Sequence, residues 1–443
     1  MKNTECDVLV IGGGITGVAA AVAAARNGSK TVLIESRTFV GGNGTVGYCF
    51  HNYISKNGQQ MVFGLAQEIV DKLVQMGGAV GHVPYGGFVH SVTPVDGEMF
   101  RILSTQLLAE AGVTVLYGAI AVGVEVDGGY IKGVKIALKG SVETIRAKTY
   151  IDASGDADVA ISAGAQYEKG DDVSGKMQPV SILLRFYGTD NKAIAEAVGA
   201  KKLALAKRSD YPEQIPVYFD GNFSKWNDLV LEQGIFPNKD HKVFVNTVWP
   251  NQLNVNTAAI MGVDGTDPVA LSKATSESVQ QVYKISKFLK EYVPGFKDAY
   301  FSPASFAGVR ETRRIVGLYK ISDDDAINGQ KFEDTIGRVC FPVDIHDPVT
   351  GQASFHDIGD DGSFDIPFRA LIPQGLENLL VAGRCISTTT YVLGATRNHA
   401  PCLVMGQSAG IAASIAAQKG VSMPELDIKA LQENLKENGV YLG

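Results

Sequence analysis

The sequence predicts an α/β fold built on a parallel sheet, and the first 35 residues carry the observations that predict it. Residues 8–11 and 31–34 are short runs of β-branched and aliphatic residues, typical of strands buried on both faces. The alanine-rich stretch between them has the composition of a helix that runs to about Asn27, and Gly28 stops it. Strand, helix and strand in this order predict a βαβ unit.

The turn before this helix has glycines at positions 12, 14 and 17, in G-x-G-x-x-G spacing. Gly12 permits a tight turn, Gly14 lets backbone reach a pyrophosphate at the helix N-terminus, and Gly17 allows close helix–strand packing. Glu35 closes the second strand, where an acid would accept hydrogen bonds from an adenosine ribose. Together these features predict a Rossmann-type dinucleotide site. The alternative is a glycine-rich turn in an ordinary βαβ unit.

Length, composition and charge exclude several classes of protein. A chain of 443 residues exceeds one ordinary domain, so two domains are expected. Hydrophobic residues make up 45% and charged residues 20%, as in soluble globular proteins. The net charge of −7 argues against a nucleic-acid-binding surface, which would be basic. The sequence leaves the oligomeric state open.

The cysteines and the N-terminal residues predict a cytoplasmic protein. The five cysteines are odd in number and form no C-x-x-C pair, which favours reduced thiols. No signal peptide is expected, because the first strand begins by residue 6. The apolar stretch 18–25 is too short to cross a bilayer, so no membrane span is predicted. No metal site is predicted either.

The next elements extend the first domain. The glycine-rich loop 36–50, with the pair Gly41 and Gly42, is expected to continue the dinucleotide site, and a flexible surface loop is the alternative. Apolar spacing then predicts helices over 61–76 and 98–111. Short strands are expected over 113–117, 120–126, 130–138, 142–147 and 149–152.

Residues 166–334 have a different texture, with long polar loops and prolines, and predict an inserted mixed α+β domain. It should contain a strand pair, 180–187 with 242–249, and a long helix over 268–293 capped near Thr266 or Asp267. A hairpin is expected within 342–367. A buried strand at 379–382 then leads through Gly383 to a helix over 400–419 whose small residues indicate close packing.

This order predicts a nucleotide-binding domain in two parts, 1–165 and 335–443, interrupted by a substrate or cap domain over 166–334. Residues 56–90 fit either domain. The discontinuity favours flavin enzymes, which wrap a long FAD with distant segments, over simple NAD dehydrogenases.

Three motifs resemble the FAD-dependent oxidoreductases of the glutathione-reductase-like superfamily, over essentially the whole chain. They are GGGITG with Glu35, TYIDASGDADVA at 149–160, and NLLVAGRCIS at 378–387 followed by ATRNHAPCLVMGQSAGIAA. Within the superfamily, GVRETRRIVG at 308–317 resembles a bacterial group often labelled fumarate reductase or succinate dehydrogenase flavoprotein-like. The resemblance implies that FAD is the cofactor.

The resemblance also implies which residues hold FAD. The first motif would meet the pyrophosphate, Glu35 with Ser36 the adenosine ribose, and the glycine loop the pyrophosphate or ribityl chain. Val122 would lie near the adenine. The full set of implied FAD-binding residues is Gly12, Gly14, Ile15, Thr16, Gly17, Glu35, Ser36, Gly42, Asn43, Val122, Ala153, Gly155, Gly383 and Arg384.

Three departures limit the resemblance. Many relatives have an acid where this chain has Arg384, which could instead pair directly with the pyrophosphate. The histidine- and arginine-bearing phrases of true fumarate reductases have no counterpart here, which argues against fumarate as substrate. No second G-x-G-x-x-G and no Cys-x-x-x-x-Cys follow the first motif, so an ordinary disulfide reductase is excluded.

Arginines and histidines are the candidates for chemistry beside a flavin. Arg310 would share a face with Arg313 or with Arg314 if their segment is helical, and guanidinium groups bind carboxylates bidentately. Arg397 and His399 precede the last long helix, whose N-terminus would favour negative charge on a reduced flavin. The alternatives are a salt-bridge cluster of the arginines with Glu311 and a structural His399.

His51 follows the glycine loop, with Tyr48 and Cys49 beside it, and could border the flavin ring. A covalent histidyl–flavin bond through His51 is the less favoured reading. The sequence therefore predicts an FAD-dependent oxidoreductase that transfers a hydride between flavin and a small organic molecule, for which the arginines favour an anion. The rival is a non-catalytic or electron-relay flavoprotein whose inserted domain binds a protein. The substrate, the reaction direction and the electron donor or acceptor stay open.

Overall fold

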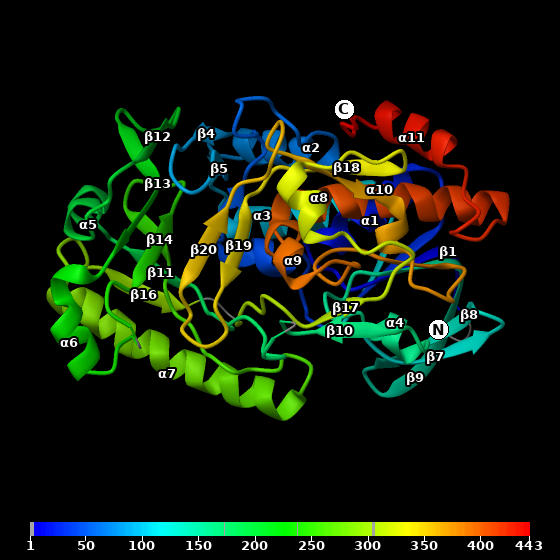
Figure 1. Cartoon of the computed structure of the whole chain (residues 1–443), viewed down its shortest axis with the longest axis horizontal. Coiled ribbons are helices and arrows are strands. Elements are labelled where there is room, and N and C mark those ends of the chain that lie inside the picture. Colours follow the sequence, from blue (N-terminus) through cyan, green and yellow to red (C-terminus); the bar gives the residue numbers. More distant parts are fainter. Residues whose placement is uncertain (1–3, 172, 237, 304–305) are drawn as a thin grey trace.

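The computed structural model describes residues 4–171, 173–236, 238–303 and 306–443 (Figure 1). Its larger sheet has five parallel strands in the order β6 (Thr114–Tyr117), β2 (Thr31–Glu35), β1 (Thr4–Ile11), β9 (Ser141–Asp152) and β22 (Leu379–Val381). β8 (Tyr130–Leu138) and β7 (Ile120–Asp127) continue it antiparallel from β9. The fold is therefore α/β with a Rossmann-type parallel sheet, as the sequence predicts.

Two helices that lie far apart in sequence pack together beside this sheet. Helix α1 (Ile15–Arg26) crosses α10 (His399–Lys419), and both are buried along nearly their whole length (Figure 1). A Cβ added at Gly406 would lie 2.3 Å from the Thr16 carbonyl oxygen, and one at Gly410 would lie 2.2 Å from that of Ala20. The small residues of α10 are therefore what brings the C-terminal segment back to the first helix.

The structure corrects one expectation for this part of the chain, the division of residues 142–152 into two strands. Residues 142–147 and 149–152 form one continuous strand, β9, which pairs with β8 at its start and with β1 from Ile145 to Asp152. Helix α10 is long and apolar enough to cross a membrane by length and composition, with a mean hydropathy of 1.4. Its apolar window is wholly buried inside the molecule, as in the core helix of a globular protein.

A second sheet is antiparallel throughout and lies to the left in Figure 1. Its strand order is β12 (Ala204–Lys207), β13 (Gln214–Asn222), β14 (Lys242–Asn246), β15 (Gln252–Asn256), β11 (Leu184–Tyr187) and β16 (Tyr300–Pro303). Helix α7 (Pro268–Tyr292), capped by the Asp267 side chain, packs Val282, Ile285, Phe288 and Leu289 into the core of this layer. The expected strand pair 180–187 with 242–249 is wrong in detail, because β15 lies between β11 and β14.

Smaller elements connect the two layers. The hairpin of β19 (Val343–His346) and β20 (Ala353–His356) lies between the two sheets in Figure 1. The remaining strands form three small sheets, β3 (Phe50–His51) with β5 (Ser91–Thr93) and β4 (Val83–Pro84), β10 (Tyr167–Lys169) with β17 (Arg313–Ile315), and β18 (Thr335–Val339) with β21 (Phe364–Pro367). The other helices are α2 (Leu65–Gln75), α3 (Gly97–Glu110), α4 (Asp158–Ser162), α5 (Asn191–Ala197), α6 (Asn227–Glu232), α8 (Asp323–Asn328), α9 (Thr390–Thr396) and α11 (Ile428–Glu437).

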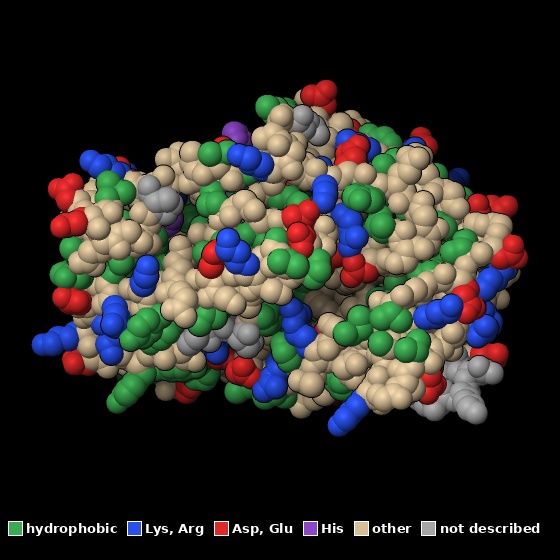
Figure 2. Space-filling model, turned by 90° about the horizontal axis from the view of Figure 1, so that it is seen from below, with side chains coloured by type: hydrophobic (Ala, Val, Ile, Leu, Met, Phe, Trp, Pro, Cys, Tyr) green, Lys and Arg blue, Asp and Glu red, His purple; other side chains and the backbone are tan. Residues whose placement is uncertain are grey.

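The molecular surface carries charges of both signs. Figure 2 shows one face on which Lys and Arg side chains alternate with Asp and Glu, without a continuous basic patch. The same face is hollowed near its centre. The charge of this face therefore gives no field of a single sign.

Candidate functional site

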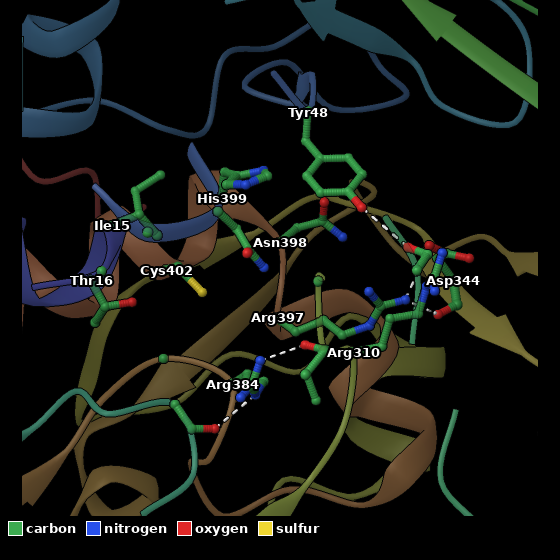
Figure 3. A pocket seen from close by; sticks show the side chains of 18 of the residues that line it. Ile15, Thr16, Tyr48, Arg310, Asp344, Arg384, Arg397, Asn398, His399 and Cys402 are labelled. Atoms are coloured by element: carbon green, nitrogen blue, oxygen red, sulfur yellow. Dashed lines mark hydrogen bonds and ion pairs between the residues drawn. The ribbon is translucent and has the colours of Figure 1, made fainter. Parts of the chain in front are cut away.

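A cavity of about 450 Å³ lies where the two layers meet. The larger sheet's side contributes the start of α1 at Gly14 and the start of α10 at Asn398 and His399. The second sheet contributes Tyr218 from β13, and the β19–β20 hairpin contributes Phe355. The cavity is therefore built from segments spread over nearly the whole chain, and Figure 3 shows it from close by.

Two helix N-termini open into this cavity. The residue before α1 is Gly14 and the residue before α10 is Asn398, and neither makes a side-chain capping hydrogen bond. The first backbone N–H groups of a helix have no partner inside it and carry a partial positive charge. Both ends are therefore suited to bind negative groups.

The glycine turn is shaped by close contacts on one side and open space on the other. A Cβ at Gly12, where φ is +95°, would lie 2.6 Å from the Ala153 oxygen, and one at Gly17 would lie 1.8 Å from the Gly12 oxygen. A Cβ at Gly14 would meet nothing within 4 Å. Backbone at Gly14 therefore leaves a space over the start of α1 that a ligand can approach.

Glu35 is buried and holds the turn together. Its carboxylate accepts hydrogen bonds from the backbone N–H of Gly13 at 2.7 Å and of Arg37 at 2.8 Å, and from the Ser36 hydroxyl at 3.1 Å. Glu35 does not line the cavity.

The FAD-binding residues implied by the sequence divide into two groups. Those that line the cavity are Gly14, Ile15, Thr16, Gly42, Asn43, Ala153, Gly155, Gly383 and Arg384. Those that do not are Gly12, Gly17, Glu35, Ser36 and Val122. The Val122 side chain lies on β7 and is 55% exposed. The cavity is thus lined by residues from all three motifs, including one glycine from each, Gly14, Gly155 and Gly383.

Arg384 lines the cavity, but its guanidinium is already engaged. Nε donates to the Gly155 oxygen at 2.7 Å, Nη2 pairs with Asp156 at 2.6 Å, and Nη1 donates to the Val309 oxygen. Three of its donors are therefore committed within the protein. A direct pyrophosphate contact, predicted from the departure at this position, would have to use the remaining donors.

Arg310 and Arg397 face the same part of the cavity, around Asp344 (Figure 3). Arg397 Nη2 lies 3.2 Å from the Asp344 carboxylate and 3.0 Å from its backbone oxygen. Arg310 donates to the Pro179 oxygen at 2.7 Å. A guanidinium has five donors, so both arginines keep donors for a ligand.

Asp344 is held ionised by its neighbours. Burial alone would raise the pKa of its carboxyl, but His346 and the two arginines Arg397 and Arg310 lower the pKa below its ordinary value. His346 Nε2 lies 3.4 Å from the Asp344 carboxylate. Burial and the charge of Arg310 lower the pKa of His346 to about 4, so this ring is neutral at pH 7.

His399 and His51 also line the cavity as neutral rings. Burial lowers the pKa of His399 to about 3 and that of His51 to about 4. His399 stacks on Phe50, with ring centroids 4.7 Å apart. His399 Nδ1 and His51 Nε2 are buried polar atoms without a hydrogen-bond partner among the described residues, and so is Arg397 Nε. Such orphaned atoms indicate a partner that binds here.

The arginines of the 308–317 phrase do not act as one cluster. The segment is not helical: Arg313 and Arg314 belong to strand β17, where neighbouring side chains point to opposite faces. Arg313 pairs with Asp158 and donates to the Asp156 oxygen at 2.7 Å, outside the cavity lining. Arg314 is buried and pairs with Glu311 at 2.6 Å. The salt-bridge alternative therefore describes both Arg313 and Arg314, and a shared helical face with Arg310 is wrong for both.

Several lining residues had no recognisable signal in the sequence. Asp344 and His346 alternate on one short strand, where their polarity marked only a hairpin. Ser181 is another such residue, and its Oγ lies 3.1 Å from the hydroxyl of Tyr48, which was expected beside the flavin ring. The second sheet, the hairpin and nearby loops add Phe88, Ser181, Tyr218, Phe244, Asn246, Asn256, Phe341 and Phe355. Within the described residues, no group of three or more His, Cys, Asp or Glu is arranged to hold a metal ion.

Comparison with known proteins assigns the chain, rather than the cavity, to a family of enzymes. The family model described as FAD dependent oxidoreductase matches residues 7–435. No curated protein matches the sequence.

Solved structures resemble the fold. The flavin-dependent brominase Bmp2 superposes with a TM-score of 0.51 at 12% identity, covering 98% of this chain and 83% of the brominase. The p-nitrophenol 4-monooxygenase PnpA from Pseudomonas putida DLL-E4 superposes with a TM-score of 0.51 at 10% identity, covering 99% of this chain and 89% of that one. At these identities the likeness shows the fold alone.

FAD is the cofactor of the matching family, and the cavity fits it. The open space at Gly14 and the uncapped start of α1 suit a pyrophosphate. The uncapped start of α10, with the orphaned His399 and Arg397 nitrogens beside it, suits the polar edge of a flavin ring.

Proposed function

The chain belongs to the FAD-dependent oxidoreductase family, and we propose that this enzyme transfers a hydride between FAD and a small organic anion held by Arg310 and Arg397. One observation carries the proposal: these two cations line the same cavity as the open N-termini of α1 and α10. A substrate anion bound there would lie in the cavity that takes the cofactor.

Bound FAD would supply the hydride chemistry, and the chain's own groups would orient it. Gly14, Ile15 and Thr16 would hold the pyrophosphate with backbone N–H groups. The start of α10 would stabilise negative charge on the reduced ring, because its partial positive charge faces the cavity.

The charges of the cavity lining support an anionic substrate. Arg384 is neutralised by Asp156, at 2.6 Å. Arg397 forms an ion pair with Asp344, whereas Arg310 acts on that carboxylate only through its charge, and His346 beside it is neutral. One positive charge therefore remains uncompensated among these groups. A carboxylate would neutralise it and accept bidentate hydrogen bonds from a guanidinium.

Aromatic side chains support a substrate with an apolar body. They line the cavity from the second sheet, the hairpin and neighbouring loops, and comprise Tyr48, Phe88, Tyr218, Phe244, Phe341 and Phe355. Such walls exclude water and favour apolar groups through burial of surface. A small carboxylate with an aromatic or aliphatic part fits both features.

The finer assignments remain part of this proposal. Residues 166–334 would form the substrate domain, inserted between FAD-binding parts at 1–165 and 335–443. Val83, Val89 and Val92 pack against Ala204 and Val217 of the second sheet, which supports placing part of 56–90 with the substrate domain.

The resemblance also leaves a subgroup and a setting as proposals. The chain would belong to the glutathione-reductase-like branch and to the bacterial group labelled fumarate reductase-like, with a small molecule as substrate and a separate electron donor or acceptor. A cytoplasmic setting is supported by the cysteines, because all five are buried free thiols.

The experiment uses FAD-loaded protein and small probe anions. Benzoate, phenylacetate and hexanoate are titrated against their uncharged amides, and binding is followed by the change in flavin absorption. Carboxylates should perturb the spectrum and bind, whereas the amides should not. Arg397→Met and Arg310→Met should keep FAD and weaken carboxylate binding by about 2–5 kcal/mol, the cost of removing one partner of a buried charge pair.

Arg313→Met is the matched control, because Arg313 belongs to the same sequence phrase but lies outside the cavity lining. It should bind carboxylates like the unaltered protein. Equal affinities for carboxylates in all three variants would contradict the proposal.

A further inference from the structure

A second cavity of about 320 Å³ adjoins the first. The two cavities share four lining residues, Phe244, Asn256, Arg310 and His346. Two of these come from adjacent strands of the second sheet, β14 and β15, and His346 comes from the hairpin strand β19. Because these four residues line both cavities, a ligand that lies between the second sheet and the hairpin could extend from the first cavity into the second.

The shared wall carries the cation that the proposed function uses. On the side of the first cavity, Arg310 interacts electrostatically with Tyr48, Arg397 and Asp344. The same guanidinium lines the second cavity. An anion bound between Arg310 and Arg397 would therefore lie at the entrance to the second cavity.

The far part of the second cavity is also cationic. Lys239 and Lys242 line it, and both are exposed. Lys242 Nζ lies 3.5 Å from the Ala353 oxygen and 5.3 Å from the Phe355 ring centroid, and it forms no ion pair with a described residue. The one acid in the lining, Asp240, has its carboxylate held by the Asn227 side chain at 3.0 Å.

The histidine of this lining does not add to the charge. His241 Nε2 lies 2.8 Å from the Thr257 oxygen, and its ring stacks on Phe236 with centroids 4.0 Å apart. Burial lowers the pKa of His241. The net charge of the second cavity's lining is therefore positive, because of Lys239, Lys242 and, at the inner end, Arg310.

We propose that the two cavities form one continuous site for an elongated substrate with an anionic group at each end. The first group would lie at Arg397 and Arg310, and the second would reach Lys242 in the second cavity. This inference rests on the proposed function, because it takes the arginine pair as the first anchor. The second group is a carboxylate or a phosphate, since either would accept hydrogen bonds from the lysine ammonium.

The test measures binding of probe acids of graded length to the FAD-loaded protein by flavin absorption. α,ω-Dicarboxylates and ω-phosphonocarboxylates are compared with monocarboxylates of the same chain length. Once the chain spans both cavities, the diacids should bind about tenfold more tightly than the monocarboxylates, the gain of one charge-assisted hydrogen bond at a partly exposed site. Whichever diacid series gains more identifies the second group.

Two variants locate the second anchor. Lys242→Met should remove the advantage of the diacids, and Ala353→Trp, which fills the second cavity, should weaken long probes more than short ones. Lys207→Met is the matched control, because Lys207 is an exposed lysine of the same sheet and lines neither cavity. It should keep the full advantage.

The outcomes separate this inference from the proposed function. Short carboxylates that bind while diacids of every length gain nothing would overturn the inference alone, and would leave the second cavity as a passage. An advantage of the diacids that survives Lys242→Met and Ala353→Trp would also overturn it. If no carboxylate of any length binds, both the inference and the proposed function fail.

Discussion

At the scale of single residues, the cavity is lined by titratable side chains whose pKa values differ from their ordinary values, because of burial and of neighbouring charges. Arg310 and Arg397 keep Asp344 ionised, while His51, His346 and His399 are held neutral. This combination places a net positive charge among uncharged donors and acceptors. It is the arrangement that an anionic ligand needs and that an apolar core would avoid.

The buried histidines predict how stability depends on pH. Burial lowers the pKa of His51, His82 and His346 to about 4 and that of His399 to about 3, from an ordinary value of 6.5. Between pH 6.5 and about 4 the unfolded chain therefore binds more protons than the folded one, so stability is present above pH 6.5 and falls as the pH falls. Each histidine should contribute about 1.4 kcal/mol per pH unit in that window.

Urea unfolding at a series of pH values measures this slope. His399→Asn should reduce the slope by about one proton, whereas His356→Asn, at an exposed position, should leave it as it is. An unchanged slope in His399→Asn would show that this ring is already charged, or already accessible, in the folded protein.

Which residues could be predicted from the sequence follows from how local their signals are. Gly14 lies in a motif whose spacing alone predicts a turn and a helix start, whereas Thr16 is implied by the resemblance to a flavoprotein family. Arg313 could not be separated from Arg310 in the same way, because the difference depends on an extended backbone and on Asp158, far away in sequence. Asp344 was missed because nothing near it in sequence marks its ion pair with Arg397.

At the scale of elements, the crossing of α1 and α10 fixes where the site forms. The helices come from opposite ends of the chain, and both begin at the cavity. Their contact depends on glycines, since any side chain at Gly406 or Gly410 would strike the backbone of α1. The small residues in the sequence predicted this packing. The hairpin of β19 and β20 was predicted only as a hairpin, because its position between the sheets depends on tertiary contacts.

The same glycine-to-alanine change should mainly lower stability at one point of these helices and mainly lower FAD affinity at another. Gly410→Ala should destabilise the protein by about 1–3 kcal/mol, because its Cβ would lie 2.2 Å from the Ala20 oxygen. Gly14→Ala should cost less stability, because its Cβ would meet nothing within 4 Å, but should weaken FAD binding. Unfolding free energies of the apoprotein and FAD titrations measure the two effects.

Each of these two predictions can be contradicted by its own measurement. Full stability in Gly410→Ala would mean that the helices do not pack as closely as described. An unchanged FAD affinity in Gly14→Ala would mean that the pyrophosphate does not approach the start of α1.

At the scale of the whole molecule, the site exists only because two layers meet. The Rossmann-type sheet supplies the helix N-termini that suit FAD, and the antiparallel sheet with the hairpin supplies aromatic walls and Asp344. Ligand sites commonly form at such junctions, where walls from two layers can exclude water. The second cavity adjoins the first at this junction, since both are lined by Phe244, Asn256, Arg310 and His346.

A crystal structure of the protein with FAD bound tests the central claim most directly. The account predicts pyrophosphate density over Gly14 at the start of α1, and the flavin ring inside the 450 Å³ cavity, between the start of α10 and the pair Arg310 and Arg397. A ring that points out of the cavity, away from both arginines, would contradict the account, and so would an FAD bound away from α1.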